Sequence, residues 1–200
     1  MMSCLPQTAG QCKYMLALQS TKPIVVVNAP AGTGKTLIAC HEAMRYQRIA
    51  LTRPTVAADE DLGYLPGDSD SKLAPWTRPM FDVFEKHMSR SQMDRAVRVE
   101  PLGFLRGRTF ERTFILADEM QNSTRSQMQL LLTRLGPECK LVVTGDLHQS
   151  DVGPENGLAD LLRRIDGLDL AHVETIEMTQ ADILRSDAVR EILTVYGLKV

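Results

Sequence analysis

Residues Ala29-Pro30-Ala31-Gly32-Thr33-Gly34-Lys35-Thr36 follow the β-branched run Ile24-Val25-Val26-Val27-Asn28 and precede the apolar run Leu37-Ile38-Ala39. A strand, a loop of small residues and a helix in this order are the context in which Gly-x-x-x-x-Gly-Lys-Ser/Thr forms a phosphate-binding P-loop. Inward backbone N–H groups and the positive end of the new helix would bind the phosphates. The alternative is a glycine-rich turn that precedes a helix and carries Lys-Thr by coincidence.

The P-loop pattern predicts a role for each residue type. We expect Lys35 to contact the β- and γ-phosphates of ATP and Thr36 to hold Mg²⁺. Ala29 stands where the first glycine is usual, and because alanine disfavours positive φ, we expect the start of the loop to differ slightly. The residues predicted to bind the nucleotide here are Pro30, Ala31, Gly32, Thr33, Gly34, Lys35 and Thr36.

A second motif, Phe114-Ile115-Leu116-Ala117-Asp118-Glu119, indicates a buried strand that ends in two carboxylates. In P-loop proteins an acidic residue at this place binds Mg²⁺, so Asp118 is the predicted metal ligand. Glu119 is then the predicted general base that accepts a proton from the attacking water. The alternative is that one of these carboxylates caps a helix or lies in a solvated turn.

A third motif, Val142-Val143-Thr144-Gly145-Asp146-Leu147-His148-Gln149, again places polar residues at the carboxyl end of a buried strand. Ligands bind at this edge of an α/β sheet. The amide of Gln149 is predicted to orient water and to contact the γ-phosphate. Taken alone, Thr144-Gly145-Asp146 would indicate only a turn.

Composition favours one compact domain over residues 1–200, with 24% charged and 44% hydrophobic residues. No segment approaches the roughly 18 consecutive apolar residues of a membrane span, so no membrane partner is expected. The first six residues lack the charged and apolar regions of a signal peptide. The four cysteines are scattered, which favours reduced thiols in the cytoplasm over a zinc site or disulfides.

Strand and helix patterns alternate, which predicts an α/β fold with a mainly parallel sheet and helices on both faces. Residues 54–75 are rich in Pro, Gly and Asp and indicate a long loop, a feature that is usually functional or mobile. The expected strands are 24–28, 49–52, 97–100, 113–117, 141–144 and 173–178. The expected helices are 8–19, 35–46, 76–88, 123–135, 158–165 and 188–196.

Charge is unevenly distributed, although the net charge is only −2. Between Arg78 and Arg112 there are eight basic and five acidic residues. Such a basic segment is suited to a phosphate backbone, and the alternative is a solvated surface of helices and loops.

The three motifs, at residues 32–36, 118–122 and 145–149, resemble motifs I, II and III of superfamily 1 helicase-type ATPases. Three further blocks resemble the PhoH-like family: Leu-Thr-Arg-Pro-Thr-Val at 51–56, Leu-Gly-Tyr-Leu-Pro-Gly-Asp at 62–68 and Arg-Gly-Arg-Thr-Phe at 106–110. The resemblance covers nearly the whole chain, from about Gln11 to Tyr196. It implies a single RecA-like P-loop NTPase domain.

The resemblance also implies roles for four residues outside the motifs. Gln11 is similar to the glutamine that reads adenine ahead of the P-loop, since an amide matches both N6 and N7 of adenine; the alternative is an exposed helix glutamine. Arg185, in Asp182-Ile-Leu-Arg185, would stabilise charge on the γ-phosphate. Arg106 and Arg108 would do the same across a subunit interface, or would bind RNA phosphates.

The resemblance implies an ATP hydrolase that uses Mg²⁺ and couples turnover to the binding or remodelling of RNA or another single-stranded nucleic acid. One domain of this length cannot close an ATP cleft between two RecA-like domains, so coupling would require a homo-oligomer, for example a hexameric ring. The alternative is a nucleotide-gated assembly protein without unwinding activity. A small-molecule kinase is a third possibility, but it gives no reason for the second and third motifs.

Overall fold

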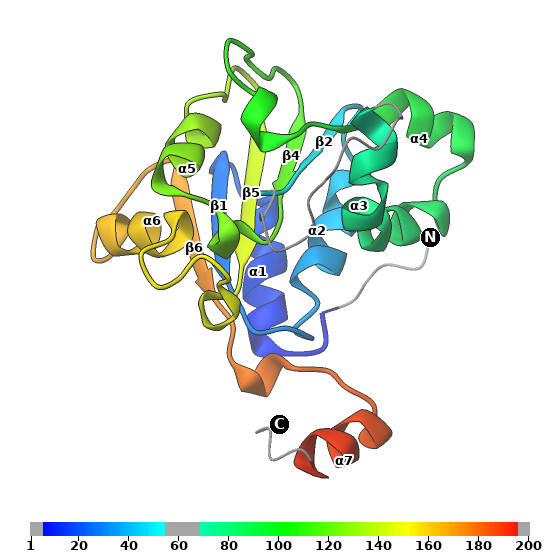
Figure 1. The fold of residues 1–200 in the computed structure, drawn as a ribbon, viewed down its shortest axis with the longest axis vertical. Helices are drawn as coiled ribbons and strands as arrows, with labels where there is room; N and C mark the ends of the chain where they lie inside the picture. Colours follow the sequence, from blue (N-terminus) through cyan, green and yellow to red (C-terminus); the bar gives the residue numbers. More distant parts are fainter. Residues whose placement is uncertain (1–5, 55–68, 196–200) are drawn as a thin grey trace.

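The computed structural model describes residues 6–54 and 69–195, and at its centre lies a six-stranded sheet (Figure 1). All neighbouring strands are parallel, in the spatial order β3-β2-β4-β5-β1-β6. The strands are β1 (Ile24–Asn28), β2 (Ile49–Thr52), β3 (Val97–Val99), β4 (Phe114–Ala117), β5 (Lys140–Gly145) and β6 (Val173–Glu177). The central strands are apolar runs because both of their faces are covered by other elements.

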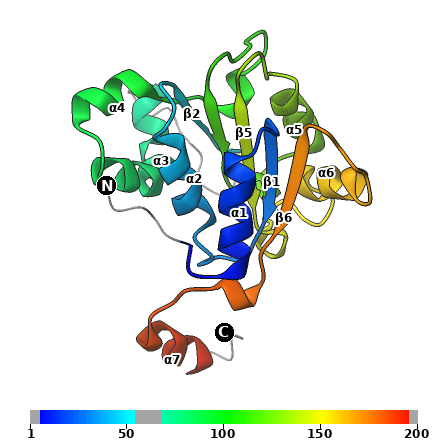
Figure 2. The same ribbon diagram turned by 180° about the vertical axis from the view of Figure 1, so that it is seen from behind.

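Helices cover both faces of the sheet. On one face lie α1 (Ala9–Gln19), α2 (Lys35–Ala43) and α3 (Ser69–Glu85), best seen in Figure 2. On the other lie α5 (Arg125–Leu132) and α6 (Gly157–Ile165) (Figure 1). Two more helices complete the fold: α4 (Arg90–Ala96), next to α3 and β3, and α7 (Asp187–Val195), which lies apart from the sheet. The predicted α/β fold is therefore confirmed.

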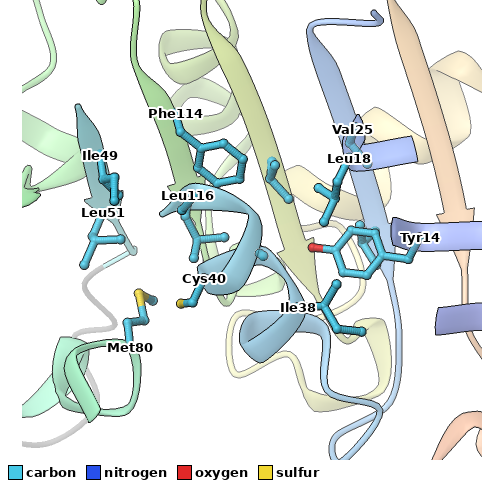
Figure 3. Close-up of a cluster of buried hydrophobic side chains, with 14 of the residues drawn as sticks. Tyr14, Leu18, Val25, Ile38, Cys40, Ile49, Leu51, Met80, Phe114 and Leu116 are labelled. Carbon is cyan, nitrogen blue, oxygen red and sulfur yellow. The ribbon is translucent and has the colours of Figure 1, made fainter. Parts of the chain in front are cut away.

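Alternating strand residues divide the interior into two hydrophobic cores. Val25 and Val27 of β1 point to the α1–α3 face, whereas Val26 points to the α5–α6 face. Figure 3 shows the first core, in which the fully buried side chains of Tyr14 and Phe114 lie over the sheet. Burial of each large apolar side chain contributes about 1.5–3 kcal/mol, so this double core holds the strand ends in fixed positions.

The predicted strands agree with the structure to within one residue at each end, but some helices differ. Within the predicted loop 54–75, residues 55–68 lie outside the described residues, and residues 69–75 belong to α3, so that part of the prediction was wrong. Pro75 lies inside α3, although proline usually disfavours the interior of a helix. The buried side chains of Met80 and Phe84 on one face of α3 outweigh the cost of proline in a helix.

The bounds of two further helices were mispredicted, and one helix was missed. α2 ends at Ala43 rather than at residue 46, and α5 runs from Arg125 to Leu132 instead of 123–135. α4 was not predicted, although Ser89 and Gln92 form a capping box that marks its start. Among the described residues, no helix is long and apolar enough to cross a lipid bilayer.

Candidate active site

The P-loop joins the carboxyl end of β1 to the amino end of α2 (Figure 1). The Ala29 N–H donates to Gly145 O at 2.9 Å, which ties the start of the loop to β5. Gly32 and Gly34 have φ of 85° and 77°, a conformation that glycine adopts without steric cost. Ala29 is not among the described residues with positive φ, so nothing in its backbone conformation requires glycine there.

A buried carboxylate lies directly beside the P-loop. Thr36 Oγ1 donates to Asp118 Oδ1 and Oδ2 at 3.1 and 3.2 Å. Thr144 Oγ1 donates to Asp118 Oδ1 from the neighbouring strand β5. The structure thus brings together the two predicted metal ligands, Thr36 and Asp118. A hydroxyl and a carboxylate are hard oxygen donors that suit Mg²⁺, which usually takes one or two carboxylates with phosphates and water.

Burial raises the pKa of Asp118 above its usual value, and the nearby negative charge of Glu119 adds to this effect. The hydrogen bond from Thr144 and the positive charges of Arg53 and Lys35 act in the opposite direction without cancelling it. A carboxylate that is costly to ionise in this way gains strongly from a bound cation.

Glu119 has an unusual backbone conformation. Its φ of 55° and ψ of 37° place it in the left-handed region, which costs of the order of 1–3 kcal/mol for a non-glycine residue and is concentrated at functional sites. Glu119 precedes the short helix η2 (Met120–Asn122) as its N-cap residue, but its side chain makes no capping hydrogen bond. Gln121 Nε2 instead donates to Glu119 Oε2 at 2.6 Å. The capping alternative therefore does not explain the Glu119 side chain.

Gln11 lies behind the P-loop. Its side chain is buried, so the alternative of an exposed helix glutamine is wrong. Gln11 Nε2 donates to Thr33 O at 3.0 Å, and Gln11 Oε1 accepts from Gln7 N at 2.8 Å. The predicted contact with adenine stays a prediction, whereas its neighbour Tyr14 is a core residue.

Asp182 fixes the start of α1 against the short helix η4 (Gln180–Asp182). Its carboxylate accepts from Thr8 Oγ1 at 2.6 Å, Gly10 N at 3.0 Å and Thr179 N at 2.9 Å. Burial acts to raise the pKa of Asp182, but these hydrogen bonds outweigh it and hold the pKa below its usual value. The helix that carries Gln11 is thereby anchored next to the segment that carries Arg185.

Arg185 lies against the P-loop of its own chain. A Cβ atom built on Gly32 would lie 3.1 Å from Arg185 Nε, and Leu184 N donates to Gly32 O at 3.2 Å. Arg106 and Arg108 instead belong to the segment that precedes β4. Figure 1 shows this segment at the opposite end of the sheet from the P-loop. Arg108 forms an ion pair with Glu100. The proposed roles of all three arginines stay predictions.

Two residues of the third motif, Asp146 and Gln149, form hydrogen bonds with Gln121 through their backbones. Gln149 lies in the short helix η3 (Leu147–Gln149) with an exposed side chain, and its contact with the γ-phosphate stays a prediction. Asp146 Oδ2 accepts from Ala31 N in the P-loop at 3.2 Å. Sequence reasoning assigned no role to Thr144, Asp146 or Gln121, although each lies inside a motif that it had identified.

Comparison with known proteins gives one family. Residues 3–197 match the family model described as PhoH-like protein. The PhoH-like protein of Bacillus subtilis (strain 168) is 36% identical, with 95% of this chain and 63% of that protein covered. Protein PhoH of Escherichia coli (strain K12) is also 36% identical, with 96% and 58% covered. The chain therefore spans less than two thirds of the length of these relatives.

Among solved structures, the large terminase from a thermophilic bacteriophage is similar in fold. Its TM-score is 0.61 at 12% sequence identity, with 95% of this chain and 50% of that chain covered. At this identity the likeness concerns the fold alone.

Proposed function

This chain belongs to the PhoH-like family, and from that premise and the site geometry we propose that it binds and hydrolyses ATP with Mg²⁺. The observation that carries the proposal is the contact between Thr36 and Asp118 beside a P-loop whose glycines are in the left-handed conformation. Thr36 and Asp118 would hold Mg²⁺, which when bound would offset the charge of the phosphates. Lys35, which is buried at the start of α2, would bind the phosphates with its ammonium group.

Four further side chains would each have a separate role in catalysis or nucleotide binding. Glu119 would accept the proton of the attacking water, and Gln149 would orient that water. Arg185 would stabilise the charge that grows on the γ-phosphate in the transition state. Gln11 would select adenine through its amide, which requires it to exchange its present backbone partners for the base.

Two substitutions test this proposal. Lys35→Ala should abolish hydrolysis and weaken ATP binding, because a buried positive charge on the phosphates is lost. Glu119→Gln should retain ATP binding by calorimetry and lower kcat by about 10²–10⁴-fold, the usual effect of losing a general base. Glu138→Gln is the matched control, since Glu138 is an exposed glutamate with a similar φ of 56°. Hydrolysis by Lys35→Ala at the parent rate would refute the P-loop assignment.

We also propose that turnover is coupled to RNA or another single-stranded nucleic acid. Part of the basic segment is neutralised within the chain, because Arg78 pairs with Asp82 and Glu85. The structure nevertheless gathers four arginines and two glutamates around a cavity of 280 Å³ beside β2 and β3: Arg48, Arg95, Arg98, Arg108, Glu100 and Glu111. This excess of positive charge at one place supports a phosphate contact.

Salt dependence tests the nucleic-acid proposal. For single strands, removing the neutralisation of one phosphate lowers the slope of log K against log salt by about 0.7. Replacing Arg95 and Arg98 together with Gln should therefore reduce the slope for single-stranded RNA by about 1.4 if each binds one phosphate. An unchanged slope would show that these arginines belong to a solvated surface.

The second candidate is a nucleotide-gated assembly protein, and one observation favours it. Helix α7 lies apart from the sheet (Figures 1 and 2) and exposes Val189, Ile192 and Val195. An apolar face of this kind suits contact between copies of the chain in a homo-oligomer, such as the hexameric ring that the family resemblance implies. Stimulation of ATP hydrolysis by single-stranded RNA would favour the first candidate. Unstimulated hydrolysis with ATP-dependent oligomerisation in native mass spectrometry would favour the second.

A further inference from the structure

We propose that Gln121 is a positioning residue for hydrolysis, which fixes the Glu119 carboxylate and connects it to the loop that follows β5. The inference rests on the proposed ATPase function and adds a residue to it. Gln121 does not need to contact the nucleotide for this role, because it acts through Glu119.

The first support is the set of hydrogen-bond partners of the Gln121 side chain, in a residue that is only 1% exposed. Nε2 donates to Glu119 Oε2 at 2.6 Å and, more weakly, to Gln149 O at 3.4 Å. Oε1 accepts from Asp146 N at 3.1 Å. Both ends of the amide are therefore used, and every partner belongs to the second or third motif.

The second support is the space that Gly145 leaves for this amide. A Cβ atom built on Gly145 would lie 2.8 Å from Gln121 Oε1, 3.1 Å from Gln121 N and 2.5 Å from Leu158 Cδ2. Gly145 is not among the described glycines with positive φ. Glycine is therefore needed here for space rather than for backbone conformation, and part of that space is occupied by Gln121.

The third support is the connection to the P-loop. Asp146 Oδ2 accepts from Ala31 N at 3.2 Å, and the backbone N–H of Asp146 is the donor to Gln121. One hydrogen-bonded chain thus runs from the P-loop through Asp146 and Gln121 to Glu119. Glu119, at the end of this hydrogen-bonded chain, is the residue with the left-handed backbone conformation.

These contacts give Gln121 a defined effect on the chemistry. Its donor occupies Oε2 of Glu119, which leaves Oε1 to accept the proton of water. Without this bond the carboxylate can rotate, and a displacement of about 1 Å at a reacting group costs about 10²-fold in rate. We therefore expect Gln121→Leu to lower kcat by about 10²-fold, with little change in the dissociation constant for MgATP.

A double-mutant cycle separates positioning from a purely structural role. Single-turnover rates at saturating MgATP are measured for Gln121→Leu in the parent and in the Glu119→Gln background. If Gln121 acts through the carboxylate, the second background shows no further loss beyond about twofold, the accuracy to which independent effects add. Equal losses in both backgrounds would overturn the inference. Gln129→Leu, an exposed glutamine on α5, is the control and should leave the rates unchanged.

A second variant covers the case in which Gln121→Leu fails to fold, because it leaves the Asp146 N–H without its acceptor. Gln121→Glu retains an acceptor for Asp146 N but places a second carboxylate against Glu119. The like charges displace the Glu119 carboxylate, so this variant should show the same pattern in the cycle. If the parent itself does not hydrolyse MgATP, the proposed function fails and this inference fails with it. If the parent hydrolyses MgATP but either folded variant loses activity equally in both backgrounds, only the positioning role is refuted.

Discussion

Gly10→Ala should destabilise the protein, although the same change in a helix is usually favourable. Gly10 is the second residue of α1, and a Cβ atom built there would lie 2.5 Å from both carboxylate oxygens of Asp182. The carboxylate must therefore retreat by roughly 1 Å to reach an ordinary van der Waals separation. Such a shift lengthens the hydrogen bonds that Asp182 accepts from Thr8 Oγ1 and Gly10 N, now 2.6 and 3.0 Å.

The magnitude follows from two opposing contributions. Replacing glycine by alanine within a helix stabilises it by up to about 1 kcal/mol. Each hydrogen bond to a charged group contributes about 1.5–3 kcal/mol, so the loss of two gives a net destabilisation of about 2–5 kcal/mol. For a chain of this size, 1 kcal/mol corresponds to about 2–4 °C, which predicts a fall in Tm of about 4–20 °C.

Thermal and urea denaturation measure the effect, with Gly103→Ala as the matched control. A Cβ atom at Gly103 would meet nothing within 4 Å, so its change in stability should stay within about 0.5 kcal/mol. In an Asp182→Ala background the clash is absent, and Gly10→Ala should become neutral or stabilising. A rise in Tm for Gly10→Ala alone, or equal destabilisation in both backgrounds, would refute the anchoring of α1 by Asp182.

Three further predictions concern charged residues. Burial and a neighbouring negative charge raise the pKa of Asp118, so its ionised form lowers the stability of the folded protein above that pKa. In Mg²⁺-free buffer at pH 7, Asp118→Asn should therefore keep or raise Tm. In a separate assay with MgATP, the same variant should show no hydrolysis. The gain in Tm should vanish below about pH 3.9, where the unfolded chain is protonated as well. Arg185→Ala should lower kcat by about 10³–10⁵-fold with ATP affinity nearly intact. Mixing this variant with Lys35→Ala should restore no activity, because Arg185 lies against the P-loop of its own chain. Recovery of activity in mixed oligomers would show that Arg185 serves the site of a neighbouring subunit. Lys140 Nζ donates to three carbonyl oxygens at and just after the end of α1, 2.7–3.0 Å away, so Lys140→Met should destabilise the protein by about 2–4 kcal/mol in urea denaturation.

The strands and the P-loop could be predicted from the sequence because their determinants are local. A β-branched run such as residues 24–28 favours an extended backbone whatever lies next to it in space. The P-loop is one contiguous segment, and its function depends on the spacing of its own glycines, lysine and threonine. For the same reason, most of α3 lies within the predicted helix 76–88, whereas its start at Ser69 was not predicted.

The partners of the site residues were decided only by the tertiary structure. Asp182 meets Gly10 across almost the whole chain, and Thr144 meets Asp118 because β4 and β5 are neighbours in the sheet. Gln121 fits beside β5 because Gly145 has no side chain. The local sequence pattern predicts where each strand lies but not which strands become its neighbours in the sheet. Strand order depends on how the two hydrophobic cores are filled together. The motifs therefore determined which chemical groups are present, and the packing of the sheet determined which of them touch.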